Sequence, residues 1–237
     1  MGTNLMDYTN YMTEGVYLEQ TADHIHVRFD RPSPVISSAV LNGGAVNADH
    51  ILNLSVRDQV KNGSEVWQPP EATLAEYCRN CGWSGTVVGL MTAASIDSFR
   101  LVQTTEQGVE IFVLVTAGLS NARRAGDYAE HREIGIPHHQ TGTINIICMT
   151  TAVLTPAAML EAVITATEAK AAALQNLGTK SLVSGSPATG TGTDAIAVVC
   201  GHGSTKVQYC GKHVIFGEIL AKLVIEAVTS SIKVSNS

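Results

Sequence analysis

The second half of the chain repeats one arrangement, an apolar strand followed by a helix. Thr143–Thr151 is an almost unbroken apolar run, and a helical pattern follows it as far as Leu177. Ala195–Cys200 is a second apolar run, and another helical pattern extends from about Lys212 to Ser230. Strands that alternate with helices predict a sheet with helices packed on it. We therefore expect an α/β (mixed α+β) fold with a mixed β-sheet.

The two predicted helices have recognisable ends and apolar faces. Thr155 is a favourable N-cap, Pro156 suits the first helical position, and Gly178 suits the position after the last turn. The large apolar residues of the first helix predict a buried stripe of Leu160, Val163, Ile164, Ala171 and Leu174. The corresponding stripe of the second helix comprises Phe216, Ile219, Leu220, Leu223, Val224 and Ala227.

A short motif opens both strand–helix units. Residues 141–147 read Thr-Gly-Thr-Ile-Asn-Ile-Ile, and residues 191–197 read Thr-Gly-Thr-Asp-Ala-Ile-Ala, which is an offset of 191 − 141 = 50 residues. This suggests an internal strand–helix pseudo-repeat, with pseudo-two-fold symmetry in the sheet. Chance recurrence of such a simple motif is the alternative, and the residues alone leave both open.

The first half of the chain predicts further strands. We expect residues 1–20 to form an irregular N-terminal arm and residues 21–237 to form one domain. His24–Phe29 alternates polar and apolar residues, as a half-buried strand does. Pro32 and Pro34 are expected to interrupt it before a second strand at residues 35–41. The patterns that follow predict a helix at 71–79 and an antiparallel meander of strands at 86–92, 99–105 and 109–116.

Composition excludes several classes of function. The chain has 15 basic and 21 acidic residues, a net charge of −6, and one adjacent basic pair, Arg123–Arg124. Nucleic-acid binding requires a clustered basic surface, so we expect no nucleic-acid partner. No apolar run is hydrophobic enough for a membrane span, and the N-terminal residues do not resemble a signal peptide. With five cysteines in no framework spacing, the chain is expected to be a cytoplasmic protein with reduced thiols.

Small polar residues and glycines collect where the predicted strands begin or end. They include Asn42 and Gly43, Asn121 with Asp127, Thr143 with Asn145, and the run Thr189-Gly190-Thr191-Gly192-Thr193-Asp194. Glycine lets a ligand approach the backbone, and threonine and asparagine supply neutral donors and acceptors. This lining suits a large neutral ligand that bears carboxamides. The phosphate-binding and dinucleotide-binding glycine motifs are absent.

Two residues could act as a general base. Asp194 lies between a glycine-rich loop and an apolar strand, where a carboxylate can accept a proton or orient another group. The alternative for Asp194 is a turn residue that binds backbone amides. His213 lies at a predicted helix start, where the helix dipole favours a neutral imidazole. The alternative for His213 is a capping or packing role.

Metal ligation is the less favoured interpretation of the remaining histidines and cysteines. His131, His138 and His139 lie near Asp127, Glu130 and Glu133, but Pro137 breaks the segment and a solvated loop is favoured. Cys78-x-x-Cys81 has no second pair. We therefore predict no metal-binding residues.

The motifs together resemble the adenosylcobinamide amidohydrolase family of corrinoid salvage over residues 22–230. In chain order they are Ser37-Ser38-Ala39 with Leu41-Asn42-Gly43-Gly44, Gly118-Leu119-Ser120-Asn121-Ala122 with Gly126-Asp127, Gly142-Thr143-Ile144-Asn145-Ile146-Ile147, Thr165-Ala166-Thr167-Glu168-Ala169-Lys170, Ala188-Thr189-Gly190-Thr191-Gly192-Thr193-Asp194, and Tyr209 with Gly211, His213, Gly217 and Glu218. The resemblance implies hydrolysis of the amide between the corrin ring and aminopropanol, giving adenosylcobyric acid for cobalamin salvage. A non-catalytic corrinoid-binding or delivery protein is the alternative.

The resemblance and the residues together suggest a division of roles. Asp194 or His213 would activate water, with Thr193 or Thr143 as an alternative nucleophile, and backbone amides of residues 190–193 would stabilise the oxyanion. The substrate-binding candidates are Asn42, Gly43, Asn121, Asp127, Thr143, Asn145, Glu168, Lys170, Thr191 and Gly192. The partner is a corrinoid that carries its own cobalt, so no cofactor is expected, while metal dependence and homo-oligomer formation stay open.

Overall fold

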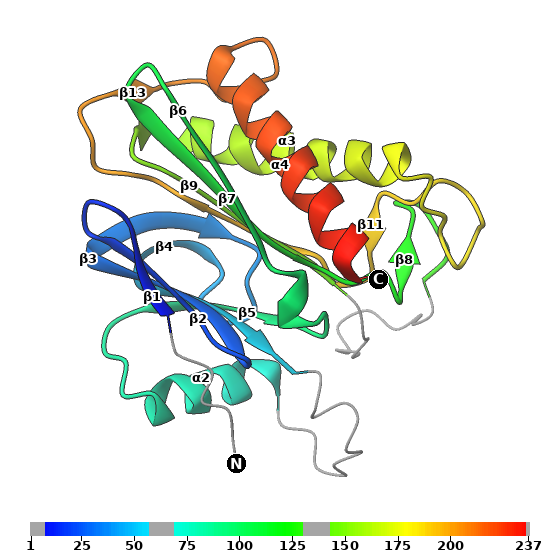
Figure 1. Ribbon diagram of the computed structural model, residues 1–237, viewed down its shortest axis with the longest axis horizontal. Coiled ribbons are helices and arrows are strands. Elements are labelled where there is room, and N and C mark those ends of the chain that lie inside the picture. Colours follow the sequence, from blue (N-terminus) through cyan, green and yellow to red (C-terminus); the bar gives the residue numbers. More distant parts are fainter. Residues whose placement is uncertain (1–7, 57–68, 130–142, 236–237) are drawn as a thin grey trace.

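A curled nine-stranded mixed sheet forms the centre of the computed structural model, which describes residues 8–56, 69–129 and 143–235 (Figure 1). The main path through the sheet runs β1 (Tyr8–Thr13), β2 (Val16–Gln20), β3 (His24–Ser37), β12 (Ala195–Val199), β9 (Ile144–Thr150), β7 (Val109–Ala117) and β6 (Arg100–Glu106). Off this path, β4 (Gly44–Ser55) pairs with β3 and with β5 (Val87–Thr92). The expected mixed α/β fold is confirmed.

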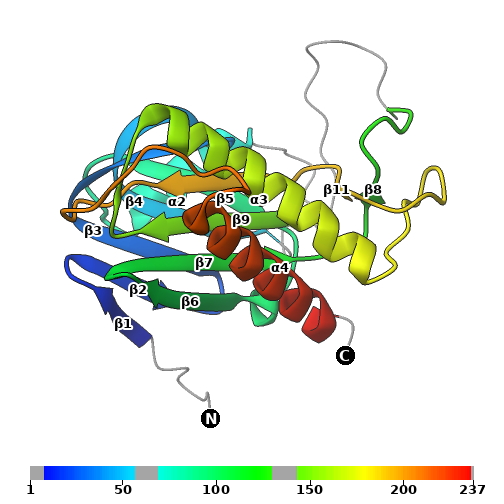
Figure 2. The same cartoon turned by 90° about the horizontal axis from the view of Figure 1, so that it is seen from above.

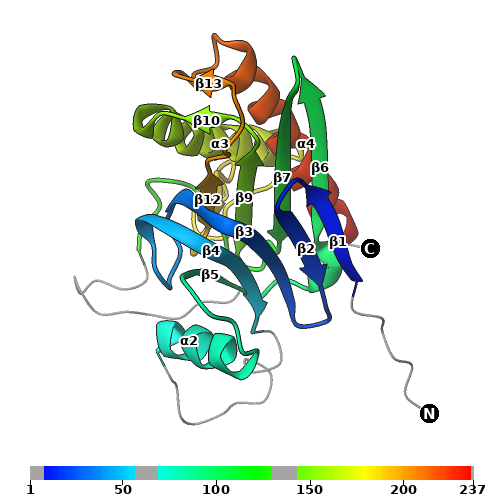
Figure 3. The ribbon, with the colours of Figure 1, turned by 90° about the vertical axis from the view of Figure 1, so that its left-hand side faces the viewer.

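The long strand β3 makes the sheet curl. Its first half pairs with β2 and its last residues, Val35–Ser37, pair with β12, while β4 runs along its other edge. The sheet therefore consists of two halves, one around β3 and β4 and one around β7 and β9 (Figure 3). One apolar cluster contains residues from both halves, including Val27, Ile51, Phe112 and Ile147.

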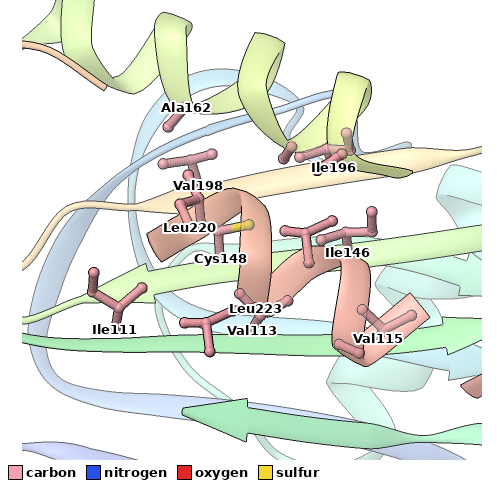
Figure 4. Packing of buried hydrophobic residues seen from close by; sticks show 14 of the residues in the cluster. Ile111, Val113, Val115, Ile146, Cys148, Ala162, Ile196, Val198, Leu220 and Leu223 are labelled. Atoms are coloured by element: carbon pink, nitrogen blue, oxygen red, sulfur yellow. The ribbon is translucent and has the colours of Figure 1, made fainter. Parts of the chain in front are cut away.

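Helices cover the outer faces of both halves. α3 (Pro156–Asn176) and α4 (Ile215–Ser235) pack on β7, β9 and β12, as Figures 1 and 2 show. Their shared core includes Val113, Ile146, Val198, Leu220 and Leu223 (Figure 4). α2 (Pro70–Asn80) covers β4 and β5 through a smaller cluster around Leu74. Within the described part of the chain, no helix has the length and apolar character of a membrane span.

The ends of α3 are as predicted, but its buried face is not. Thr155 Oγ1 accepts a hydrogen bond from Ala158 N at 3.1 Å, and Gly178 follows the helix with φ +67°. The expected stripe is wrong at Leu160 and Ile164, which are 53% and 57% exposed, and confirmed at Leu174, which is fully buried. The buried face instead consists mainly of small residues, namely Ala158, Ala162, Thr165, Ala166, Ala169 and Ala173, with Met159, Lys170 and Leu174. Small side chains allow close approach of helix and sheet, and this advantage outweighs the burial of the larger ones.

The two strand–helix units lie side by side in the sheet. β9 and β12 are parallel, and their register pairs Asn145 with Ala195 and Met149 with Val199, which is again an offset of 195 − 145 = 50 residues. Each strand leads to a helix on the same outer face. The predicted strand–helix pattern is therefore present as two adjacent units in register. The buried residues of α4, including Leu220, Leu223, Val224 and Ala227, are those expected.

Three expectations for the first half are wrong. Residues 8–20 are not irregular, because β1 and β2 form a hairpin that pairs with β3. β3 continues through its two prolines to Ser37: Pro32 falls in the irregular register between Arg28 and Ser33, and Pro34 lies in the regular pairing that follows, opposite Asn47. β5 pairs with β4 in parallel and not with β6. Of the three strands expected in the antiparallel meander, only β6 and β7 therefore pair with each other. The division into an arm and one domain from residue 21 stays a prediction.

The remaining elements are short. They are the 3₁₀ turn η1 (Ile96–Ser98), the parallel pair β10 (Val153–Leu154) with β13 (Lys206–Val207), and the antiparallel pair β8 (Ala122–Arg123) with β11 (Gly190–Thr191). The second of these pairs lies beside the end of α3 (Figure 1). It brings the chain before Ala122 close to the glycine-rich run that leads into β12.

Candidate functional site

A buried ion pair lies where α3, β9, β11 and β12 meet. Lys170 projects from α3, and its ammonium group pairs with Oδ2 of Asp194, the residue before β12. The two side chains are 8% and 10% exposed. A buried ammonium group in an apolar helix face requires a charged partner, because an isolated charge there would be costly. The pairing with Asp194 therefore explains why a lysine occupies a position on the buried face of α3.

Asp194 also joins the two repeated units. Its Oδ1 accepts hydrogen bonds from Ile144 N at 3.0 Å and from Thr191 Oγ1 at 2.5 Å. Thr191 N donates to Asp194 Oδ2 at 3.1 Å. Because these donors and Lys170 surround both oxygens, the carboxylate has little capacity left to accept a proton from water. Its geometry suits a positioning residue better than the general base that we expected.

Gly190 leaves the space that this ion pair fills. A Cβ atom at Gly190 would lie 2.8 Å from Lys170 Nζ and even closer to the Asp194 carboxylate. A side chain at this position would therefore displace one of the two charged groups. The glycine-rich run is needed here for close approach of side chains, and not for binding phosphate.

A chain of buried amides and hydroxyls extends from the ion pair into the sheet. Thr143 Oγ1 lies 2.7 Å from Thr193 O and 3.2 Å from Asn145 Oδ1. Asn145 Nδ2 donates to Asn53 Oδ1 at 2.8 Å and to the carbonyl oxygen of Met91 at 2.7 Å. Asn53 lies on β4, so the network connects the two halves of the sheet. Thr143 and Asn145 are 3% and 1% exposed.

Sequence analysis missed two members of this network. Asn53 is 3% exposed and donates through Nδ2 to Thr116 Oγ1 at 2.9 Å. Thr116 is fully buried and pairs with Asn145 across β7 and β9. The sequence does carry a signal for Asn53. It lies two residues after the buried Ile51, on the same inward face of the strand, where another apolar residue would be expected. Buried amides of this kind require hydrogen-bond partners.

Two groups at the site retain hydrogen-bonding capacity. Asn121 immediately precedes β8, and both polar atoms of its side chain are buried without a partner among the described residues. The Lys170 ammonium group carries three N–H donors, and among the described residues its hydrogen-bond partner is Asp194. Lys170 can therefore donate further hydrogen bonds. An amide-bearing ligand could satisfy both groups.

The structure separates several other candidates from the ion pair. Glu168 is exposed and pairs with Lys212 at the surface. Asn42 is exposed and donates to Val87 O at 2.8 Å, and Gly43 next to it packs on the backbone of Ala39, so both shape the turn between β3 and β4. The binding roles of Glu168, Asn42 and Gly43 stay predictions.

Asp127 and His213 also lie apart from the ion pair in their contacts. Asp127 accepts hydrogen bonds from Ser181 Oγ at 2.5 Å and Arg124 N at 2.8 Å, and the Ser181 hydroxyl is the main cause of its lowered pKa. His213 is exposed in the turn before α4, and no hydrogen bond joins it to Asp194 in the described structure. A substrate-binding role for Asp127 and a catalytic role for His213 stay predictions.

The glycine-rich loop contributes fewer free amides than expected. Thr191 N donates to Asp194 and is therefore not free to stabilise an oxyanion while that bond exists. Gly192 and Thr193 are exposed, and Thr193 O accepts from Thr143. The histidines at 131, 138 and 139, with Glu130 and Glu133, lie outside the described residues. Of the Cys78-x-x-Cys81 pair, Cys78 is buried under α2 and Cys81 is exposed.

Comparison with protein families gives one match over nearly the whole chain. The family model described as adenosylcobinamide amidohydrolase matches residues 8–237. A Methanosarcina mazei protein named adenosylcobinamide amidohydrolase is 29% identical over 205 residues, which cover 83% of this chain and 88% of that protein. An uncharacterized Methanocaldococcus jannaschii protein, MJ1613, is 37% identical over 60% of this chain. That match spans 61% of MJ1613, less than two thirds of its length.

Solved structures show only distant likeness. A Burkholderia β-aminopeptidase has a TM-score of 0.43 at 13% identity, covering 95% of this chain and 81% of that one. The PH0078 protein of Pyrococcus horikoshii has a TM-score of 0.41 at 12% identity, covering 92% and 78%. Likeness at this level carries no information about activity.

Proposed function

The chain belongs to the adenosylcobinamide amidohydrolase family of hydrolases, which act on a carbon–nitrogen amide bond in corrinoid salvage, and from this premise we propose its reaction. Water is added across the amide that joins aminopropanol to the corrin ring of adenosylcobinamide. The products are adenosylcobyric acid and free aminopropanol, and the acid can re-enter cobalamin assembly.

The observation that carries this proposal is the buried Lys170–Asp194 pair with free donors beside it. The amide to be cleaved is neutral and develops negative charge on its oxygen only as a nucleophile adds. Lys170 has N–H donors beyond the one that Asp194 engages, and Asn121 offers an unpaired amide. Neutral donors and acceptors also match the carboxamides around a corrin ring.

In this mechanism Lys170 donates to the substrate carbonyl oxygen and stabilises the tetrahedral oxyanion. Asp194 holds the ammonium group in place and links it to the peptide after Thr143 through Ile144 N. Asn121 binds a carboxamide of the substrate. The nucleophile is either water or the Thr143 hydroxyl, which lies one peptide before the Ile144 N–H bound to Asp194. The proton of the nucleophile passes to the nitrogen of aminopropanol as the C–N bond breaks. If Thr143 attacks, water then hydrolyses the Thr143 ester and releases adenosylcobyric acid.

Lys170→Met tests this assignment, with Lys222→Met as the matched control. Lys222 also pairs with an acid, Glu218, but its side chain is 72% exposed on α4. Loss of one oxyanion donor lowers kcat by about 100–1,000-fold. We expect such a loss for Lys170→Met, with cobyric acid measured by mass spectrometry and the fold checked by circular dichroism. Lys222→Met should retain wild-type turnover.

Each outcome bears on a different part of the proposal. Full turnover in Lys170→Met would exclude this ion pair from the reaction. A wild-type protein that shifts the visible spectrum of cobinamide but releases no cobyric acid would instead support a binding or delivery protein. A His213→Ala variant with impaired turnover and an intact fold would restore His213 as the base.

A second experiment distinguishes the two nucleophiles. If Thr143 attacks, brief mixing with substrate followed by acid quenching should leave a corrinoid acyl group on the protein, detectable by intact mass. Thr143→Val should abolish this adduct and the turnover together. If water attacks directly, no adduct forms, and Thr143→Val should lower turnover only through the network around Asn145.

A further inference from the structure

A second polar cluster lies at the start of β3, under α2. Glu19 is the last residue but one of β2, and His24 and His26 lie at the start of β3, after the turn between the two strands. His24 and His26 face outward toward α2, because Ile25 between them packs in the core between the sheet halves. On the neighbouring strand β4, Asn53 faces inward with Ile25. The sheet therefore separates this cluster from the network around Asn145 (Figure 3).

Three ligand atoms of the cluster converge. Glu19 Oε2 lies 3.1 Å from His26 Nδ1 and 3.6 Å from His24 Nε2, and all three atoms lie within 4.8 Å of one another. Zinc binds imidazole nitrogen and carboxylate oxygen at about 2.0–2.2 Å in a tetrahedral arrangement, which places neighbouring ligand atoms about 3.3 Å apart. The two distances from Glu19 Oε2 are close to this value.

The hydrogen bonds behind His26 determine which of its nitrogens carries a proton. His50 Nε2 lies 3.0 Å from the carbonyl oxygen of Ser84, which only accepts, so this nitrogen is protonated. A neutral His50 then accepts at Nδ1 from His26 Nε2, which is 3.0 Å away. A neutral His26 is left with a lone pair at Nδ1, directed at the Glu19 carboxylate.

Two acceptors thus face each other, and this contact requires either a metal ion or an additional proton between them. A bound metal ion satisfies the contacts from Glu19 through His26 to His50 while both imidazoles stay neutral. Without the ion, an additional proton is required. Ligating histidines commonly donate their second N–H to a fixed partner, as His26 does to His50. Trp83 stacks on the His26 ring at 3.7 Å between centroids and holds its orientation.

His24 is oriented in the same way from its other side. Its Nδ1 lies 2.8 Å from the Tyr77 hydroxyl of α2 and 3.1 Å from Thr21 Oγ1. These contacts direct Nε2 toward Glu19. The histidine side chains are 7% and 5% exposed, and that of Glu19 is 28% exposed, so solvent reaches the cluster at the carboxylate.

We propose that Glu19, His24 and His26 bind one divalent cation of the zinc class, with water as the fourth ligand. Two imidazoles and one carboxylate are suited to zinc. The ion clamps the β2–β3 hairpin beneath α2 and is structural, because the sheet separates it from the Lys170–Asp194 pair. Among the described residues, this is the group of three potential ligand side chains that lie close enough together.

The test uses the full chain after chelation and dialysis. Zinc is titrated in competition with a chromophoric chelator, and cobalt(II) chloride is titrated separately to record visible absorption. We expect one equivalent of zinc to bind, a tetrahedral cobalt spectrum, and a rise in melting temperature with zinc. Glu19→Gln and His26→Asn should each lower zinc affinity at least 100-fold and remove the thermal shift.

Three further variants make the result specific. Glu14→Gln changes an exposed acid at the turn between β1 and β2 and should bind zinc as the wild type does. Cys81→Ser should also bind normally, which excludes thiol ligation. His50→Asn should lower affinity by about 10–100-fold through the orientation of His26.

Clear results would overturn the proposal. Absence of saturable zinc binding, or equal binding by wild type and Glu19→Gln, would show that a proton occupies the space between Glu19 and His26. Melting curves without metal show whether each variant is folded before titration. Because Lys170→Met should retain zinc binding, failure of this proposal and failure of the proposed hydrolase activity can be told apart.

Discussion

The buried pair of Lys170 and Asp194 predicts a large and asymmetric loss of stability on substitution. Asp194→Asn keeps the shape of the side chain but leaves the Lys170 ammonium group buried without a counter-charge. Breaking such a pair from one side costs about 3–5 kcal/mol. In Lys170→Met the carboxylate keeps its donors from Ile144 and Thr191, so we expect a smaller cost, about 2–3 kcal/mol.

Removing both charges should restore part of the loss. We expect the cost of the double variant to fall below the sum of the single costs by about 2–3 kcal/mol, the upper range for residues in direct contact. Urea unfolding followed by circular dichroism measures this. With a slope of about 3 kcal/mol/M, Asp194→Asn should lower the midpoint by about 1–1.7 M. Additive costs, or a midpoint no lower than that of Lys222→Met, would refute the reasoning, because the pair would then behave as solvated.

Three further substitutions and one reagent test other parts of the structure. Gly190→Ala should cost about 1–3 kcal/mol in urea unfolding and impair turnover, since the new methyl group displaces the ion pair, and a neutral result would show that the ammonium group has room. Ala166→Leu should cost a similar amount in the same assay, whereas Ile164→Gln should change the midpoint little because Ile164 is exposed; the opposite order would show that the large residues of α3 face the core. Iodoacetamide labelling of the exposed Cys81 should accelerate as pH rises, because its pKa is raised by partial burial and the thiolate is the reactive form. Cys148, whose pKa burial raises to about 12, should remain unlabelled until urea is added, and labelling of Cys148 in the native protein would contradict the packing of β9.

Local signals made the second half of the chain predictable. The caps Thr155 and Gly178 mark a helix by interactions within a few residues, and the apolar runs that form β9 and β12 need no partner to be recognised. Polar residues at the strand ends also indicated Asp194, and the block that matches the family indicated Lys170. Their contact with each other could not be predicted, because it depends on how α3 lies on the sheet.

Interactions between distant segments explain the errors. β4 contains Asn47, Asp49, His50 and Asn53, and these polar residues interrupt the apolar run that is typical of a strand buried on both faces. Asp49, His50 and Asn53 each bind a partner far along the chain, as Asn53 does with Asn145. The hairpin of β1 and β2 is likewise stabilised by pairing with β3 and not by its own sequence pattern.

The resemblance in sequence indicated the family but not the positions of all its matching residues. Asn42 and Glu168 belong to matching blocks, yet the first braces a turn and the second forms a surface ion pair. Asn121 and Asn145 belong to such blocks too; Asn145 is buried, and Asn121 precedes the strand that pairs with Gly190 and Thr191. Which residues face the ion pair follows from register and helix rotation, and neither can be read from a single chain.

The alanine face of α3 has a consequence for the evolution of catalysis. Lys170 shares that face with Ala166 and Ala169, so the depth at which the helix lies on the sheet sets how far the ammonium group extends. A methylene added to any of these alanines would lift the helix. In the proposed mechanism Lys170 is a reacting group, and displacement of such a group by about 1 Å can cost on the order of 100-fold in rate. Larger side chains at the contact between α3 and the sheet would therefore lower the rate without touching the substrate. Variation in the family should favour the solvent-exposed side of the helix.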